Sequence, residues 1–261
     1  MFIKLSLLKR KIRGASLEIF NRIENNGNAA FRSNGEERFI LNLFQSFSKN
    51  KQKRVVFDIG ANIGNYSKII EEEALKTGVD VDLHLFEPTK KSFEVLKCRF
   101  DAERTTLNQF GASSENGLAS IFYDKELSSL SSLYQRNLDC YKLKLDQSEE
   151  VKLKRLDGYI REKNIKHIDF MKVDIEGHEL KAFEGFGEYL DGGFIDYIQF
   201  EYGGANLDSG VSLMEIYQML SGRNFVIAKV MPTGLEVRSY SPYMDNFNYA
   251  NYVAVSRNKI Q

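Results

Sequence analysis

The sequence predicts an α/β fold in which a mostly parallel sheet carries helices on both faces and has an antiparallel edge. Short apolar runs alternate with amphipathic segments, which is typical of strands joined by helical crossovers. Several of these runs end directly in a carboxylate, as at Asp58, Glu87 and Asp174. The last two apolar runs flank a long turn, and this arrangement favours an antiparallel pair.

Residues 1–50 are predicted to form an N-terminal helical extension, and residues 51–261 a single α/β domain. The segment Met1–Arg13 mixes basic and apolar residues without an acid and is too short for a membrane span. Such a helix can contact an anionic membrane surface peripherally, but packing on the domain or on a second subunit is the commoner arrangement. Asn34-Gly35-Glu36-Glu37 is expected to open another amphipathic helix, which runs to Phe47.

The rest of the chain divides into strands and helices by its periodicity. Strands are expected at residues 55–57, 82–86, 106–110, 119–123, 151–153, 168–173, 195–200, 225–230 and 251–255. Helices are expected at residues 64–76, 89–100, 178–189 and 213–220, with a further helix beginning at residue 156. The polar segment 124–149 gives no clear prediction, and such loops often form binding pockets.

Composition excludes several classes of protein. Lys plus Arg and Asp plus Glu both number 36, so the neutral chain lacks the positive surface of a nucleic-acid binder. Two separated cysteines, Cys98 and Cys140, indicate no disulfide framework and favour a reducing compartment, the cytoplasm. Three scattered histidines with no cysteine cluster make a zinc site improbable.

The segment from Asp58 to Asn65, Asp-Ile-Gly-Ala-Asn-Ile-Gly-Asn, predicts a ligand-binding turn between a strand and a helix. Gly60 and Gly64 permit close approach of a ligand to the backbone, and the helix directs free N–H groups to the same place. Asn62 occupies the position at which a dinucleotide turn carries its second glycine. The carboxylate of Asp58 would repel a pyrophosphate but attract the ammonium group of S-adenosylmethionine.

The next two strand ends extend this cofactor site. Glu87, followed by Pro88, ends the second strand and is expected to accept both ribose hydroxyls. The adenine is expected beside the end of the third strand, near Phe110 and the segment Gly111-Ala112-Ser113. The predicted cofactor-binding residues are Asp58, Gly60, Ala61, Asn62, Gly64, Asn65, Glu87, Pro88, Gly111, Ala112, Ser113 and Asp174.

A second group of polar residues follows the strand 168–173. Asp174 ends this strand, and Glu176 and His178 lie in the turn before the next helix. Parallel strands share their carboxyl edge, so these side chains are expected beside Asp58 and Glu87. Glu179 is expected to complement the start of the helix.

Three motifs in order resemble the signature of the FkbM family of methyltransferases: residues 58–64, Phe86-Glu87-Pro88, and residues 172–179. Asn34-Gly35-Glu36 and the segment Asn248–Tyr252 are also similar to that family. The resemblance implies a Rossmann-like class I methyltransferase fold that uses S-adenosylmethionine. It further implies O-methylation of a hydroxyl on a small-molecule acceptor such as a sugar or a polyketide.

Methyl transfer to a hydroxyl needs a group that removes the proton, and Asp174, His178 and Glu201 are the candidates. Asp174 and Glu201 could instead hold a divalent cation such as Mg²⁺, although the sequence supplies no fixed ligand spacing. Two other functions stay open: a nicotinamide-dependent oxidoreductase and a binding module without catalysis.

Overall fold

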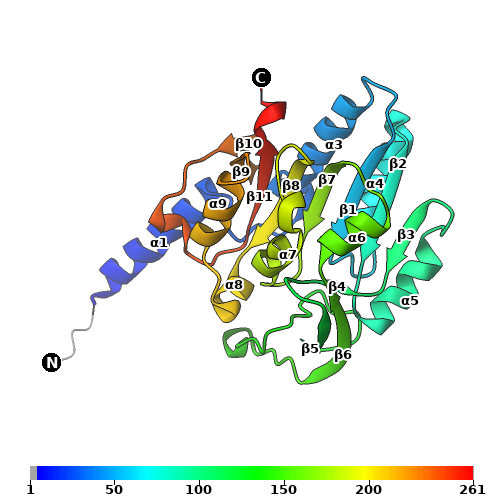
Figure 1. Cartoon of the computed structure of the whole chain (residues 1–261). Helices are drawn as coiled ribbons and strands as arrows, with labels where there is room; N and C mark the ends of the chain where they lie inside the picture. Colours follow the sequence, from blue (N-terminus) through cyan, green and yellow to red (C-terminus); the bar gives the residue numbers. More distant parts are fainter. Residues whose placement is uncertain (1–4, 261) are drawn as a thin grey trace.

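The computed structural model describes residues 5–260 and contains an eight-stranded central sheet (Figure 1). The strand order is β10-β9-β11-β8-β7-β1-β2-β3. Five neighbouring strands are parallel: β1 (Arg54–Ile59), β2 (Val81–Phe86), β3 (Thr105–Asn108), β7 (Ile168–Val173) and β8 (Ile195–Tyr202). At the other edge, β11 (Ala250–Ser256) runs antiparallel to β8 and to β9 (Phe225–Met231), and β10 (Gly234–Val237) pairs with β9. The predicted mostly parallel sheet with an antiparallel edge is therefore confirmed.

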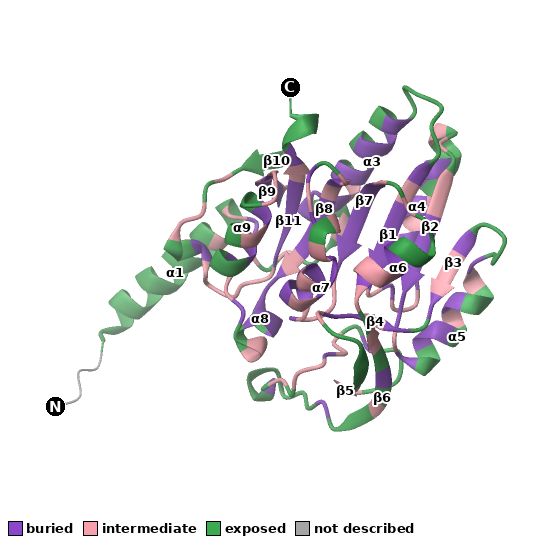
Figure 2. Ribbon diagram, viewed as in Figure 1, coloured by how far each residue is buried: buried purple, intermediate pink, exposed green. Residues whose placement is uncertain are grey.

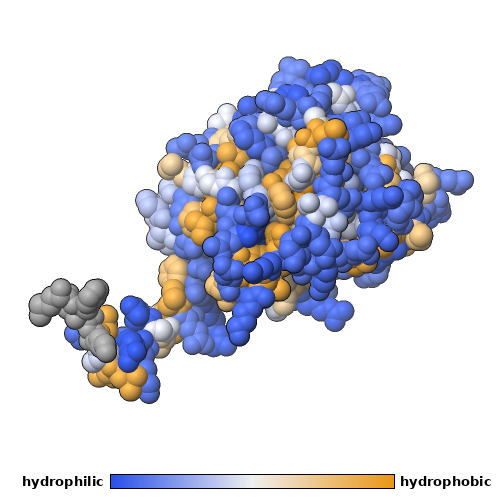
Figure 3. Space-filling model, turned by 90° about the horizontal axis from the view of Figure 1, so that it is seen from below, coloured by the Kyte–Doolittle hydropathy of each residue, from blue (hydrophilic) through white to orange (hydrophobic). Residues whose placement is uncertain are grey.

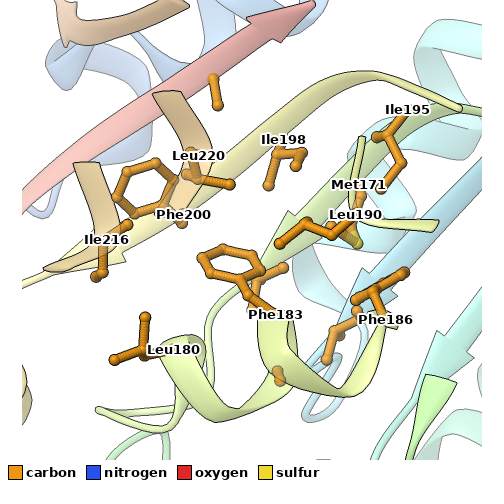
Figure 4. Close-up of a cluster of buried hydrophobic side chains, with 14 of the residues drawn as sticks. Met171, Leu180, Phe183, Phe186, Leu190, Ile195, Ile198, Phe200, Ile216 and Leu220 are labelled. Atoms are coloured by element: carbon orange, nitrogen blue, oxygen red, sulfur yellow. The ribbon is translucent and has the colours of Figure 1, made fainter. Parts of the chain in front are cut away.

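Helices cover both faces of this sheet, as the sequence predicts, and each face has its own apolar core. One face carries α3 (Glu36–Phe47), α4 (Asn65–Thr77) and α5 (Lys90–Arg99). The other carries α6 (Leu156–Glu162), α7 (Glu179–Gly185) and α9 (Leu213–Ser221). Successive side chains of β7 point to opposite faces of the sheet, so Phe170 packs in the first core and Met171 in the second. Figure 4 shows Met171 with Phe183, Phe186 and Ile198, and Figure 2 shows the buried strands between the helices.

A smaller sheet of order β4-β6-β5 lies at the carboxyl end of the central strands (Figure 1). It consists of β4 (Gly111–Ala112), β5 (Gly117–Tyr123) and β6 (Gln147–Lys154). The expected strand 106–110 is wrong in its second half, because the chain leaves the central sheet after Asn108 and β4 pairs with β6.

Two further expectations need correction. The helix expected over 178–189 is divided into α7 and a 3₁₀ turn at Gly187–Tyr189. At Gly185 a Cβ would lie 2.1 Å from the carbonyl oxygen of Ser113, so the end of α7 packs against the backbone after β4. The segment 202–211, which gave no element in the sequence, contains the short helix α8 (Gly204–Ser209).

The helix α1 (Leu7–Ile23) begins the described chain, and a short turn, α2 (Phe31–Asn34), leads from it into α3. None of the residues of α1 is buried, and the helix projects from the body in Figure 1. The expected packing on the domain is therefore wrong for most of the helix, whose end alone contacts the body through Phe20 and Tyr243, and packing on a second subunit stays a prediction. The first four residues of the predicted basic segment lie outside the described residues. Within residues 5–260, no helix is long and apolar enough to cross a membrane.

Candidate functional site

The carboxyl edge of the central sheet borders a cavity of about 420 Å³, which the smaller sheet and the loop 124–134 close from the other side. Residues from three sequence-predicted segments line it together: the glycine turn, the end of β2 and the segment after β7. The predicted residues that line the cavity are Gly60, Ala61, Asn62, Asn65, Glu87, Pro88, Gly111, Ala112, Asp174 and His178.

The glycine turn has a left-handed backbone at Gly60, with φ +88°, and again at Asn62, with φ +49°. A Cβ at Gly60 would lie 1.9 Å from the carbonyl oxygen of Asp174, so only glycine fits where the two strand ends meet. The Asn62 amide N–H donates to Glu87 Oε2 at 2.9 Å, and its side chain donates to the Ser128 carbonyl at 3.0 Å. The turn is thus tied both to β2 and to the loop that covers the cavity.

Glu87 is buried, with its carboxylate partly occupied by the protein itself. Oε1 accepts from the backbone N–H and the hydroxyl of Thr89, at 2.8 and 2.6 Å. Since a carboxylate oxygen accepts about two hydrogen bonds, Oε2 keeps one position after the contact with Asn62. Burial raises the pKa of Glu87, and the hydrogen bonds from Thr89 oppose this shift.

Asp174 pairs with a lysine that sequence reasoning missed. Lys172 Nζ lies 2.6 Å from Asp174 Oδ2 and 4.8 Å from the centre of the Tyr66 ring. The two residues point to the same side because they are separated by one position along the strand. Burial lowers the pKa of Lys172, but the negative charges of Asp174 and Asp58 outweigh it and hold the pKa above its usual value. The side chain of Asp174 is 33% exposed and faces the cavity.

Three carboxylates gather behind this point: those of Asp174, Glu176 and Glu201 have oxygens within 4.8 Å of one another. Arg136, from the poorly predicted loop, donates to Glu176 at 2.6 Å. Burial and the charge of Asp174 raise the pKa of Glu176 to about 8 and that of Glu201 well above its usual value. Glu201 lies within β8 rather than after it and does not line the cavity.

His178 lines the cavity, but both of its ring nitrogens have partners. Nδ1 lies 2.9 Å from the hydroxyl of Tyr134, and Nε2 lies 3.0 Å from the hydroxyl of Ser113. Burial and the nearby Lys181 lower the pKa of His178 to about 4. The neutral ring therefore connects the covering loop to the segment after β4.

The remaining predicted residues lie behind the cavity wall. Asp58 is fully buried and accepts a hydrogen bond from the Ser67 hydroxyl, and Gly64 packs against Phe100. Neither lines the cavity, and neither does Ser113. The geometry thus gives Asp58 and Gly64 a supporting place in the turn, in contrast to the direct cofactor contact expected for them.

A buried polar network links the site to both ends of the chain. Gln199 on β8 donates to Glu36 at 2.6 Å and accepts from the Tyr66 hydroxyl at 2.6 Å. It also lies 3.4 Å from Asn251 Oδ1. Glu36 and Asn251 belong to the motifs Asn34-Gly35-Glu36 and Asn248–Tyr252, and these motifs were the only sequence signal for the network.

A family model, the methyltransferase FkbM domain, matches residues 58–227, which is more than half of the chain. The chain belongs to the FkbM methyltransferase family. The resemblance seen in the sequence is thereby confirmed. No curated protein sequence matches the chain.

Several solved structures are similar to this chain at low sequence identity. Methyltransferase FkbM from Methylobacillus flagellatus KT is 16% identical with a TM-score of 0.49, over 83% of this chain and 48% of that one. This chain therefore spans about half the length of that protein. Cofactor-bound Rv0187 from MTB is 11% identical with a TM-score of 0.45, over 93% of this chain and 88% of that one. The METTL16 MTase domain is also 11% identical with a TM-score of 0.45, over 84% and 64%.

Proposed function

We propose that the protein transfers a methyl group from S-adenosylmethionine to a hydroxyl of a sugar-containing small molecule, with Asp174 as the general base. One observation supports this most directly: a single cavity is bordered by Glu87 and the glycine turn on one side and by Asp174 on the other. The residue proposed for the cofactor contact and the proposed proton acceptor therefore border the same cavity.

The donor groups around the cavity fit the cofactor. Oε2 of Glu87 has one acceptor position for a ribose hydroxyl, and the apolar residues Phe110 and Ala112 offer a surface for the adenine. When bound, S-adenosylmethionine supplies a methyl group on a sulfonium, which is its own leaving group.

Asp174 is the best placed of the three candidate bases. Its Oδ2 is held by Lys172, while Oδ1 makes no hydrogen bond within residues 5–260. Oδ1 would take the proton of the acceptor hydroxyl as that oxygen forms its bond to the methyl carbon. His178 has both nitrogens engaged, and the raised pKa of Glu201 favours its protonated form.

The polar lining suits an acceptor with several hydroxyls. Ser128, Ser129 and Ser131 of the covering loop line the cavity together with Lys125 and Glu176. Hydroxyl and carboxylate groups donate and accept in the pattern that a sugar needs. We place this chemistry in a reducing compartment, the cytoplasm, because Cys98 and Cys140 are exposed and unpaired.

The test is an acceptor screen with radiolabelled S-adenosylmethionine against free and lipid-linked sugars. With the best acceptor, we expect Asp174→Asn to lower kcat by about 10²–10⁴ while the affinity for S-adenosylhomocysteine is largely retained. Asp139→Asn, an exposed change outside the cavity, is the matched control.

Full turnover by Asp174→Asn would refute the proposed base. Cofactor binding without turnover on any acceptor would favour a binding module. A parallel assay after chelation with EDTA tests whether a divalent cation acts at the carboxylates of Asp174, Glu176 and Glu201.

A further inference from the structure

We infer that α1 is a docking helix that binds the anionic surface of a lipid bilayer and lies in its interface. The inference is independent of the methyl acceptor. It rests on the exposure of the helix, the arrangement of its apolar and basic residues, and its attachment to the body.

A continuous apolar stripe runs along α1. Leu8, Ile12, Ala15, Ile19 and Ile23 follow one another at intervals of three or four residues, which places them on one face of the helix. Leu8, Ile12, Ile19 and Ile23 are 56–68% exposed. Figure 3 shows apolar residues on this projecting helix beside the residues drawn in grey. An interfacial helix buries such a stripe at the boundary between headgroups and acyl chains.

Basic residues flank the stripe on both sides. At 100° per residue, Lys11 and Arg22 lie along one border and Lys9 lies along the other. Arg10 and Arg13 lie toward the opposite face, which also carries the exposed Leu7 and Leu17. In all, α1 carries five basic residues and a single acid, Glu18, so the helix is positively charged. The whole chain, in contrast, has no net charge. Long basic side chains at both borders can reach phosphate groups while the stripe enters the bilayer.

The same charge pattern argues against a second copy of α1 as the occupant. Two such helices packed in parallel through their stripes would bring Lys9 and Lys11 near the same residues of the partner helix. Like charges beside a helix seam disfavour pairing, while an anionic surface complements them. We therefore choose the lipid surface over a helix pair.

The end of α1 is fixed to the enzyme, so a docked helix would orient the body. Glu24, directly after the helix, forms ion pairs with Lys229 at 3.2 Å and with Arg238. The Gly27 N–H donates to the Tyr249 carbonyl at 2.8 Å, and the Phe20 ring meets the edge of Tyr243 at 6.1 Å between centroids.

The test is co-sedimentation of the full chain with vesicles of phosphatidylcholine alone and of phosphatidylcholine with phosphatidylglycerol. We expect binding to the anionic vesicles, at least tenfold weaker binding to the neutral ones, and loss of binding in high salt. Ile12→Glu with Ile19→Glu should abolish binding through the apolar face. Lys9→Glu with Arg13→Glu should weaken it at least tenfold through the charge.

Leu75→Glu is the matched control, because Leu75 is 75% exposed on α4, away from α1, and should leave vesicle binding unchanged. Circular dichroism and calorimetry with S-adenosylhomocysteine report whether each variant is folded. Absence of vesicle binding at low salt, or equal binding by the Ile12→Glu/Ile19→Glu variant, would overturn the proposal. Light scattering that shows a dimer lost in that variant would assign the stripe to a second copy and would also overturn it.

Discussion

The change Glu87→Gln tests the proposed cofactor site most directly, because the carboxylate has structural contacts and a proposed contact with the ribose. Oε1 accepts hydrogen bonds from the backbone N–H and the hydroxyl of Thr89. Oε2 accepts one from the Asn62 N–H and has one acceptor position left for the proposed ribose hydroxyl. Glutamine keeps the shape and one carbonyl oxygen but replaces the other acceptor by an NH₂ donor. If the carbonyl oxygen stays on Thr89, the NH₂ group faces the Asn62 N–H, whose hydrogen bond is lost. The ribose hydroxyl then meets a neutral donor where the carboxylate offers a charged acceptor.

The structure sets the size of each loss. A hydrogen bond to a charged group contributes about 1.5–3 kcal/mol, so the affinity for S-adenosylhomocysteine should fall roughly 10- to 150-fold. The unpaired N–H of Asn62 should lower the free energy of unfolding by about 1–3 kcal/mol. For a chain of this size, each lost kcal/mol lowers Tm by about 2–4 °C.

Isothermal titration calorimetry measures the affinity, and thermal unfolding without ligand measures the structural part. Glu150→Gln is the matched control, since Glu150 is exposed on β6 and does not line the cavity. An unchanged dissociation constant in the folded Glu87→Gln variant would refute the proposed ribose contact. A large loss of stability with normal affinity would leave Glu87 only its structural role.

Three further outcomes are expected. Because the pKa of His178 is about 4, the ring stays neutral near pH 6.5 and the activity should show no titration of this residue there. The unfolded chain takes up this proton more readily than the folded one, so the free energy of unfolding should fall as the pH falls from about 6.5 to 4. Urea unfolding of His178→Gln should show a smaller fall over the same range. Burial raises the pKa of Glu179 to about 7, so its contribution to the free energy of unfolding is present below about pH 4.5 and is lost as the pH rises through 7. Urea unfolding at about pH 5 and about pH 8 should therefore show a smaller difference in stability for Glu179→Gln than for the unchanged protein. Gly60→Ala should lower the free energy of unfolding by about 3 kcal/mol or more through its 1.9 Å overlap with Asp174, whereas Gly14→Ala, with nothing within 4 Å, should raise it slightly; near-equal Tm values for the two would contradict this reading of the turn.

The parts of the fold that the sequence predicted well are those whose pattern lies within one short stretch of the chain. In β1, α4 and β2, an apolar run, a glycine turn and an amphipathic segment follow directly along the chain. The loop after β5 gave no such signal because its contacts are distant in sequence. Ser132 donates to the carbonyl of Glu176, and Arg136 pairs with both Glu176 and Asp208. No periodicity of the loop itself could reveal these partners.

The candidate site was predictable to a similar extent. Shared strand ends brought Glu87, Gly60 and Asp174 to one cavity, as topology requires. The expected contact of Asp58 depended on where its side chain points, and in β1 it points into the protein toward Ser67. Lys172 was missed because a lysine two positions before a strand end looks like an ordinary exposed residue until packing buries it.

Lys172 also explains why motifs far apart in the sequence belong together. It is buried among three carboxylates, those of Asp174, Asp58 and Glu36, which raise its pKa against the effect of burial. A buried lysine needs such partners, and buried carboxylates need such a lysine. Glu36 comes from the helix before the first strand, Asp58 from the start of the glycine turn and Asp174 from the end of β7. Three of the motifs therefore supply members of a single charge cluster beneath the cavity, and the position of the proposed base depends on that cluster.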